Sequence, residues 1–281
     1  MSWATQGRLA SSSRVCYPLT RGMTDLPAKM IQSVLSGLGR FSLLVAEVVR
    51  SLATQRLSGR DVLNQLYFIG VKSQTVVLVT GAFTGMVLCA QTYFQFHKVK
   101  MDTATLAVVS VSMCGELGPV LTALMVAGRV GAAMAAELGT MKVTEQIDAL
   151  RTLAAHPIDY LVVPRVVATM IAVPLLTAES ITVGITAAYL VGVHLLQIDP
   201  GYSLVNMQRF TDHRDVLMGF IKSFIFGGII ATTGCYKGIH CGQGAEGVGH
   251  ATTEAVVYAS IAILMSNFFL TLLLTRLLAL T

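Results

Sequence analysis

The sequence predicts an all-α polytopic membrane protein with about five transmembrane helices, preceded by an amphipathic helix at the membrane interface. Hydrophobic residues make up 54% of the 281-residue chain and charged residues only 12%, whereas soluble domains carry about 25% charged residues. The mean hydropathy is +0.68. Several stretches are apolar enough and long enough to span a bilayer, which takes about 20 residues of helix.

Residues 1–25 are rich in arginine and serine and contain no acidic residue before Asp25. They lack the apolar core that a cleaved secretory signal needs. This composition fits a disordered cytoplasmic tail, which is the simpler interpretation, and it also fits an organellar transit peptide. The sequence leaves both alternatives open.

The next region, from Pro27 to about Gln55, has apolar residues at roughly helical spacing. The charged side chains that interrupt it are Lys29, Arg40, Glu47 and Arg50. Because no uninterrupted apolar span is present, we expect an amphipathic helix in the inner membrane interface, bent at Gly37–Gly39. Residues 1–60 are therefore predicted to form an N-terminal tail and interfacial helix, and residues 61–281 the transmembrane domain.

Polar connections separate the five predicted crossings. The crossings run over residues 73–96, 103–128, 166–196, 216–235 and 255–275. Eight of the 20 Lys and Arg residues lie in the first 60 positions, against two acidic residues, and the charged connection after the second crossing adds more. By the positive-inside rule, the N-terminus and the connection 129–159 are predicted to face the cytoplasm.

The deepest side chains of opposite charge in the predicted crossings are Glu116 in the second, shortly before Pro119, and Lys222 in the fourth. A charge in hydrocarbon is costly unless it is paired, hydrated or protonated, so it usually faces a cavity or a partner. Together with Gln91 and Tyr93 at the outer end of the first crossing, these two residues are predicted to bind the polar part of an amphiphile. A purely structural ion pair between Glu116 and Lys222 is the competing interpretation.

Two sets of small residues predict close contacts between helices. Gly81 and Gly85 form a GxxxG pair in the first crossing, and small residues recur every four positions at Gly128, Ala132 and Ala136. Residues four apart lie on one helix face, where a second backbone can approach closely.

Motifs for catalysis and cofactor binding are absent from the sequence. It has no P-loop, HExxH or GxSxG motif, so the chain is predicted to be non-catalytic, with any ATP hydrolysis in a partner and no cofactor of its own. The five cysteines are scattered without a CxxC motif, and Cys235, Cys241 and His240 do not complete a zinc site. The concentration of basic residues near the N-terminus favours a membrane surface over nucleic acid as a partner.

The stretch from Gly115 to Leu150 carries a resemblance to a known family. Its segments are Glu116-Leu-Gly-Pro119, Ala127-Gly-Arg-Val-Gly-Ala-Ala-Met-Ala-Ala-Glu-Leu-Gly139 and Thr144-Glu-Gln-Ile-Asp-Ala-Leu150. They resemble the signature of the MlaE/YrbE permeases, the membrane subunits of ABC-type lipid transporters that work with MCE proteins. The resemblance extends from about Gln65 to the C-terminus, through Asp159-Tyr-Leu161, Pro164-Arg165, Ile221-Lys-Ser223 and Gly247-Val-Gly249.

The resemblance implies a homodimer that carries phospholipid or a related hydrophobic lipid, with a cytoplasmic ABC ATPase dimer docked on the connection 129–159. The residues implied in this coupling are Arg129, Glu137, Glu145 and Asp148. It also implies that the polar end of the first crossing, at Gln91 and Tyr93, lines the lipid pocket. Some relatives have a basic residue where this chain has Gly115, so a headgroup contact at that position does not carry over.

The further partners that the resemblance implies are an MCE-domain substrate-binding protein and, as an accessory, a STAS-type protein. The implied location is the bacterial inner membrane, with an organellar inner envelope as the alternative, because plastid relatives exist.

Two functions of other classes compete with a lipid-transporter permease. A stand-alone secondary transporter or channel for a small amphiphile would be expected to show ion-coupling acids and internal repeat symmetry. An intramembrane enzyme would need a nucleophile or a metal constellation. The sequence shows neither set of features, and co-purification of an ATPase would separate the first function from the other two.

Overall fold

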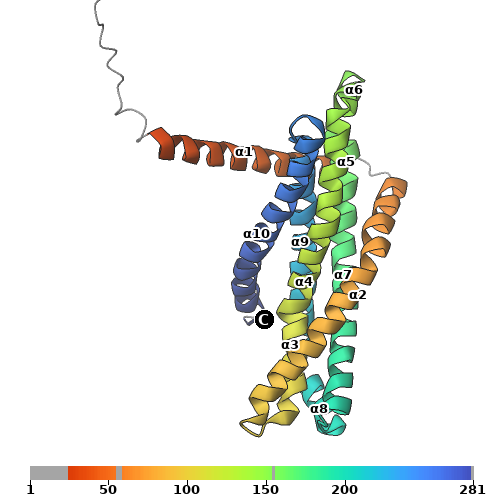
Figure 1. Ribbon diagram of the computed structural model, residues 1–281, viewed down its shortest axis with the longest axis vertical. Helices are drawn as coiled ribbons and strands as arrows, with labels where there is room; N and C mark the ends of the chain where they lie inside the picture. Colours follow the sequence, from red (N-terminus) through yellow and green to blue (C-terminus); the bar gives the residue numbers. More distant parts are fainter. Residues whose placement is uncertain (1–24, 55–58, 154–155, 280–281) are drawn as a thin grey trace, which may run out of the picture. The chain divides into compact units, whose positions relative to one another are not determined.

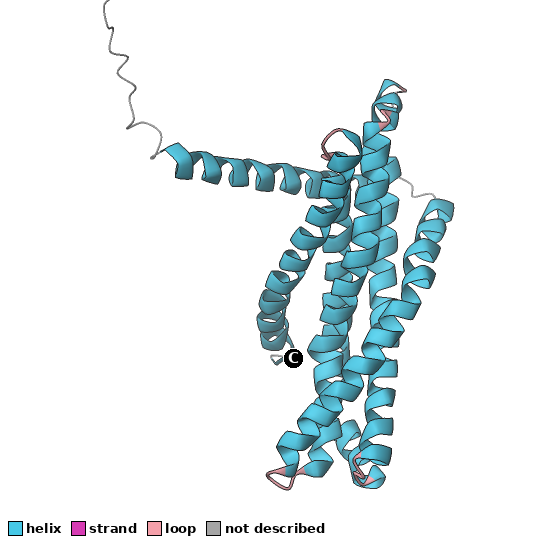
Figure 2. Cartoon of the chain, viewed as in Figure 1, coloured by secondary structure: helices cyan, strands magenta, loops and turns pink. Residues whose placement is uncertain are grey.

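A computed structural model describes residues 25–54, 59–153 and 156–279. These residues are almost entirely helical and contain no strand (Figure 2), which confirms the predicted fold class. The chain divides into two units between Leu43 and Leu44. The predicted tail or targeting segment before residue 25 lies outside the described residues.

An N-terminal helix, α1 (Asp25–Thr54), precedes the membrane-spanning helices as predicted, and its helical geometry continues through Gly37–Gly39. In the part of α1 that belongs to the larger unit, Leu44 and Val48 are buried and Val49 is exposed. Because Leu44 and Val48 are four residues apart, they lie on one face of the helix, and this face packs into the core of that unit.

Five helices of the described chain are long and apolar enough to cross a membrane. They are Gly59–His97, Asp102–Val143, Ile158–Leu195, His213–Ile239 and Gly244–Leu277. The predicted number of crossings is therefore confirmed. The five helices alternate in direction, which places α6 (Gln146–Thr152) and the α9–α10 turn at one end of the larger unit and α8 (Pro200–Phe210) at the other (Figure 1). We call these the α6 end and the α8 end.

Three of the five long helices are single elements, and the other two are divided into several. The first, fourth and fifth long helices are α2 (Gly59–His97), α9 (His213–Ile239) and α10 (Gly244–Ala279). The second runs through η1 (Asp102–Ala104), α3 (Thr105–Ser112), η2 (Met113–Leu117), α4 (Gly118–Val126), η3 (Ala127–Gly131) and α5 (Ala132–Val143). The third comprises η4 (Ile158–Val162), α7 (Val163–Leu190) and η5 (Val191–Leu195). Elements η2 to η5 are π-helical, and such turns are frequent at functional sites.

The GxxxG pair in α2 lies at a very close contact with α7 (Val163–Leu190). A Cβ atom built on Gly85 would lie 2.1 Å from the carbonyl oxygen of Gly184 in α7, and one built on Gly81 would lie 2.8 Å from that of Ser180. Such short separations leave no room for a side chain, so α2 and α7 touch backbone to backbone. The predicted contact at Gly81 and Gly85 is confirmed.

The small residues after the second crossing make a different contact from the predicted one. A Cβ atom on Gly128 would meet none of the described atoms within 4 Å. The prediction that another helix of this chain packs closely at Gly128 is therefore wrong. The close approach occurs on the next face, where a Cβ on Gly234 would lie 3.0 Å from the carbonyl oxygen of Gly131, and one on Gly238 would lie 3.0 Å from that of Ala135. These contacts hold α5 against α9.

The helices that cover the bundle expose large apolar side chains. On α2 they include Phe83 and Val87, and on α10 Phe268, Phe269 and Leu272. An apolar surface of this extent is unfavourable in water and is expected of helices that face lipid or another membrane-embedded chain. This distribution agrees with a multi-pass membrane protein.

Candidate functional site

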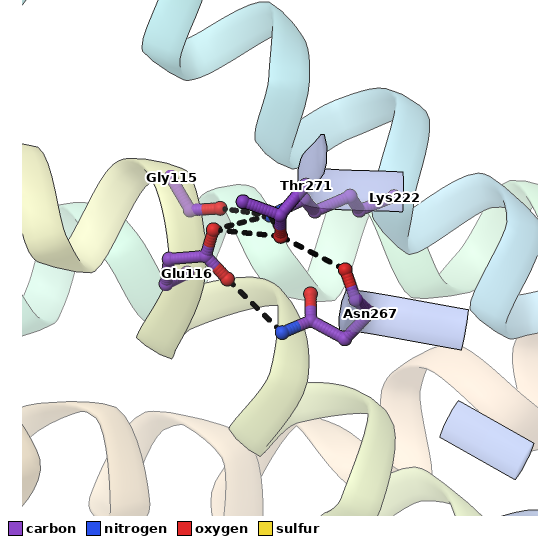
Figure 3. A network of polar contacts seen from close by, with 5 residues as sticks. All are labelled: Gly115, Glu116, Lys222, Asn267 and Thr271. Carbon is purple, nitrogen blue, oxygen red and sulfur yellow. Dashed lines mark hydrogen bonds and ion pairs between the residues drawn. The ribbon is translucent and has the colours of Figure 1, made fainter. Parts of the chain in front are cut away.

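A polar network joins three helices of the larger unit around Glu116 (Figure 3). Lys222 Nζ lies 2.6 Å from Glu116 Oε1 and donates to it. Asn267 Nδ2 donates to Glu116 Oε2 at 3.0 Å, and Thr271 Oγ1 lies 2.9 Å from Glu116 Oε1. Glu116 lies on η2, Lys222 on α9, and the other two on α10, so one carboxylate connects three spans.

Pro119 leaves a backbone carbonyl free to accept a hydrogen bond from Lys222. It lacks the backbone N–H that would donate to the carbonyl of Gly115 four residues earlier in an α-helix. Lys222 Nζ instead donates to Gly115 O at 3.0 Å, and it also donates to Thr271 Oγ1 at 2.8 Å. With Glu116, these make three acceptors for the three N–H groups of the ammonium.

The two members of the ion pair differ in accessibility. The side chain of Lys222 is 1% exposed and that of Glu116 is 41% exposed. The ammonium is therefore enclosed by its partners, whereas part of the carboxylate faces outward. In addition, Asn267 Oδ1 is buried and has no hydrogen-bond partner among the described residues. The network can thus accept a hydrogen bond from a hydroxyl or ammonium group while its own charges balance.

Sequence reasoning missed Asn267 and Thr271. Their signal was a pair of polar side chains four residues apart in an uncharged span, which places them on one helix face. This spacing lets both reach the same carboxylate, and Thr271 Oγ1 also lies 2.8 Å from the backbone oxygen of Asn267.

The structure brings together two of the four predicted substrate contacts. Gln91 and Tyr93 lie near the C-terminal end of α2, where Gln91 is exposed and the ring of Tyr93 stacks on that of His97 at 5.3 Å. His97 Nδ1 in turn lies 3.1 Å from Asp102 Oδ1. Within the described chain, no hydrogen bond or ion pair joins Gln91 or Tyr93 to the Glu116 network.

The predicted coupling residues occupy separate places toward the α6 end. Arg129 is exposed on the π turn η3. Glu145 is exposed between α5 and α6 and adopts a left-handed conformation with φ of 60°, which is uncommon outside glycine. Asp148 is exposed on α6 and lies 3.0 Å from Arg151. Glu137, on α5, forms an ion pair at 2.9 Å with Arg165, whose side chain is buried in the bundle interior.

The cysteine and histidine side chains considered for a metal site do not assemble one. Among residues 25–54, 59–153 and 156–279, no group of three or more His, Cys, Asp or Glu side chains is arranged to hold a metal ion. Cys235 is buried, and Cys241 Sγ donates to the carbonyl of Gly139 at 3.5 Å. Partial burial raises the pKa of the Cys241 thiol.

The fold and this network define a multi-pass helical membrane protein with a charge-balanced polar site between its spans. The model of the family Permease MlaE matches residues 62–273. A probable ABC transporter permease protein of Rickettsia conorii is 45% identical over 243 residues, which cover 86% of this chain and 92% of the relative.

Two further relatives have more specific names. The intermembrane phospholipid transport system permease protein MlaE of Haemophilus influenzae is 38% identical over 208 residues, or 74% of this chain and 80% of the relative. The chloroplastic protein TRIGALACTOSYLDIACYLGLYCEROL 1 of Arabidopsis thaliana is 38% identical over 228 residues, or 81% of this chain and 65% of the relative. The chain belongs to the MlaE permease family, whose members are membrane subunits of transporters.

Proposed function

We propose that the chain is the permease subunit of an ABC-type lipid transporter that moves phospholipid or a related lipid between the inner membrane and an MCE-domain partner. A separate ATPase supplies the energy. The observation that carries the proposal is the Glu116 network, which sets a balanced pair of charges and a free amide oxygen between apolar spans. Amphiphile sites combine a mostly apolar cavity with a few polar groups of this kind.

In this proposal Glu116 and Asn267 contact the lipid headgroup, and Lys222 holds the Glu116 carboxylate in place. Gln91 and Tyr93 contact the lipid nearer the α8 end of the path. The lipid tails lie against the apolar faces of the spans. Because the Glu116–Lys222 pair is neutral as a whole, it accommodates a neutral or zwitterionic headgroup without leaving an unpaired charge.

The proposed assembly contains two copies of this chain, an ABC ATPase dimer at the α6 end and an MCE-domain protein at the α8 end, with a STAS-type accessory protein as an additional subunit. Arg129, Glu137, Glu145 and Asp148 serve in coupling to the ATPase. The proposed location is the bacterial inner membrane, with an organellar inner envelope as the alternative, since relatives of both kinds occur.

Purification of the complex from its native membrane tests the proposal. An affinity-tagged chain should carry an ATPase subunit in equal amount and retain phospholipid that mass spectrometry detects. A chain that transports an amphiphile in the absence of any ATPase would instead support the stand-alone transporter.

The proposed orientation predicts which positions react with an impermeant thiol reagent in sealed cells. In a cysteine-free background, Glu145→Cys at the α6 end should react only after the membrane is opened. Tyr202→Cys on α8, where the side chain is exposed, should react from the outside. The opposite pattern at these two positions would reverse the orientation.

Charge reversal at the α6 end should weaken the binding of the ATPase. In Glu145→Lys/Asp148→Lys, both exposed acids become bases, and mismatched charges across an interface cost several kcal/mol, so binding should fall by about tenfold or more. Folding should change little, because exposed ion pairs such as Asp148–Arg151 contribute at most about 1 kcal/mol. Glu246→Lys, another exposed acid at this end, is the control. Normal ATPase binding by the double variant would contradict the coupling role.

A further inference from the structure

Arg165 is a buried arginine with an incomplete set of partners. It lies near the start of α7, is 5% exposed, and forms an ion pair with Glu137, with 2.9 Å between its Nη2 and Glu137 Oε2. Its Nε and Nη1 atoms are buried and have no hydrogen-bond partner among the described residues. A guanidinium has five N–H groups, so one carboxylate satisfies only part of it.

The partner of Arg165 is far more exposed than Arg165 itself. The Glu137 side chain is 57% exposed and that of Arg165 only 6%. A buried cation depends strongly on its remaining counter-ion, because removal of one partner leaves an uncompensated charge in the interior. Arg165 therefore depends on the position of a carboxylate that lies at the surface of a different helix.

The pair joins two elements whose main packing partners differ. α5 packs mainly against α9 and α10, whereas α7 packs mainly against α2 and α9. α5 leads directly into the α6 end, and α7 follows the return of the chain through η4. The Glu137–Arg165 ion pair is thus a direct side-chain link between the helix that enters the α6 end and the helix that leaves it.

We infer that Arg165 is a positioning residue that transmits movement of the α6 end to α7. A displacement of α5 that carried Glu137 away would leave Arg165 buried and unpaired, so α7 must follow α5. The unpartnered N–H groups on Nε and Nη1 allow Arg165 to take a second acceptor in the other conformation of the transporter. This inference rests on the proposed function, because it takes the α6 end as the place where the ATPase acts.

The test compares Glu137→Ala, Arg165→Met and the double variant in the complete complex with its ATPase. Glu137→Ala should lower the yield of folded protein, because it leaves Arg165 without a counter-ion. The double variant should restore the yield, since methionine replaces the buried cation with an unbranched apolar side chain. It should not restore coupling: the amount of phospholipid moved per ATP should stay about tenfold below that of the wild type, within the usual range of coupling between sites.

A control pair and a distance measurement complete the test. Lys237 and Glu254 form an ion pair at 2.7 Å between α9 and α10 near the same end, and Lys237→Met/Glu254→Gln should keep the wild-type coupling. Spin labels on exposed positions Thr140 of α5 and Ile171 of α7 should keep one distance through the ATP cycle in the wild type and show a broadened distribution in the double variant.

The outcomes distinguish this inference from the proposed function. If the double variant of Glu137 and Arg165 moves lipid as efficiently per ATP as the wild type, Arg165 has a purely structural role and the inference is wrong. The same holds if the control pair loses coupling to the same extent, because the effect would then be a general loosening of the bundle. If the wild-type complex itself binds no ATPase, the proposed function and the inference fall together.

Discussion

Glu116→Gln is expected to reduce the amount of folded protein sharply, and the additional change Lys222→Met is expected to restore it. The single change leaves a lysine that is 1% exposed without its counter-ion. Breaking a buried ion pair by removing one partner costs about 3–5 kcal/mol. The double variant has no charge left to bury, and methionine fills most of the volume of the lysine.

Lys222→Met alone should have a smaller effect, because the carboxylate that remains is 41% exposed and keeps its bonds from Asn267 and Thr271. Folded protein can be measured by size-exclusion chromatography in detergent and by thermal unfolding. Lys72→Met removes an exposed lysine that lies 4.5 Å from the ring centre of Phe68, a contact worth about 0.5–1 kcal/mol, and serves as a control. Equal yields for all variants would contradict the structural role of the pair.

The double variant also separates the two interpretations of this pair. A purely structural pair predicts that Glu116→Gln/Lys222→Met folds, retains lipid and transports like the wild type. The proposed headgroup site predicts a folded dimer that retains less phospholipid and transports poorly. Lipid extracted from equal amounts of purified wild-type and double-variant protein, measured by mass spectrometry, distinguishes these results.

Gly85→Leu is expected to prevent α2 from packing against α7. Even a single Cβ at this position would lie 2.1 Å from the carbonyl oxygen of Gly184 and 2.9 Å from its Cα. The atoms in the way belong to the backbone, so they cannot rotate aside as a side chain can. The loss of stability should therefore reach or exceed the upper end of the range for overpacked cores, about 3 kcal/mol.

Gly70→Ala is a matched control on the same helix. A Cβ at Gly70 would meet none of the described atoms within 4 Å, and alanine favours a helix over glycine by about 1 kcal/mol. This variant should be as stable as the wild type or slightly more stable. Thermal unfolding in detergent compares the Gly85→Leu and Gly70→Ala variants. A Gly85→Leu protein as stable as the wild type would contradict the backbone contact between α2 and α7.

The number of spans could be predicted from the sequence because the length of an apolar run is a direct consequence of bilayer thickness. The α2–α7 contact was also predictable, since Gly81 and Gly85 are the only two glycines in their crossing and are four residues apart. The contact between α5 and α9, after the second crossing, could not be predicted from the sequence. Gly131, Ala135 and Gly139 repeat the same four-residue spacing as Gly128, Ala132 and Ala136, so periodicity alone cannot decide which face packs against α9.

The candidate site was predictable only in part, for a related reason. Glu116 and Lys222 stand out because charges are rare in apolar spans, and their pairing was one of two interpretations that the sequence allowed. Asn267 and Thr271 are uncharged, and their role depends on how α10 lies against η2. The link between Glu137 and Arg165 likewise depends on the relative position of α5 and α7, which no local pattern specifies.

The central claim is that this chain provides a path for phospholipid that is driven by a separate ATPase. The most direct test reconstitutes the purified complex, with its ATPase and MCE-domain partners, into vesicles that contain a labelled phospholipid. The proposal predicts that lipid moves between the membrane and the MCE-domain protein only when ATP is hydrolysed, and that Glu116→Gln/Lys222→Met strongly reduces this movement while the complex stays assembled. Lipid movement that is independent of ATP, or no movement with an active ATPase bound, would contradict the claim.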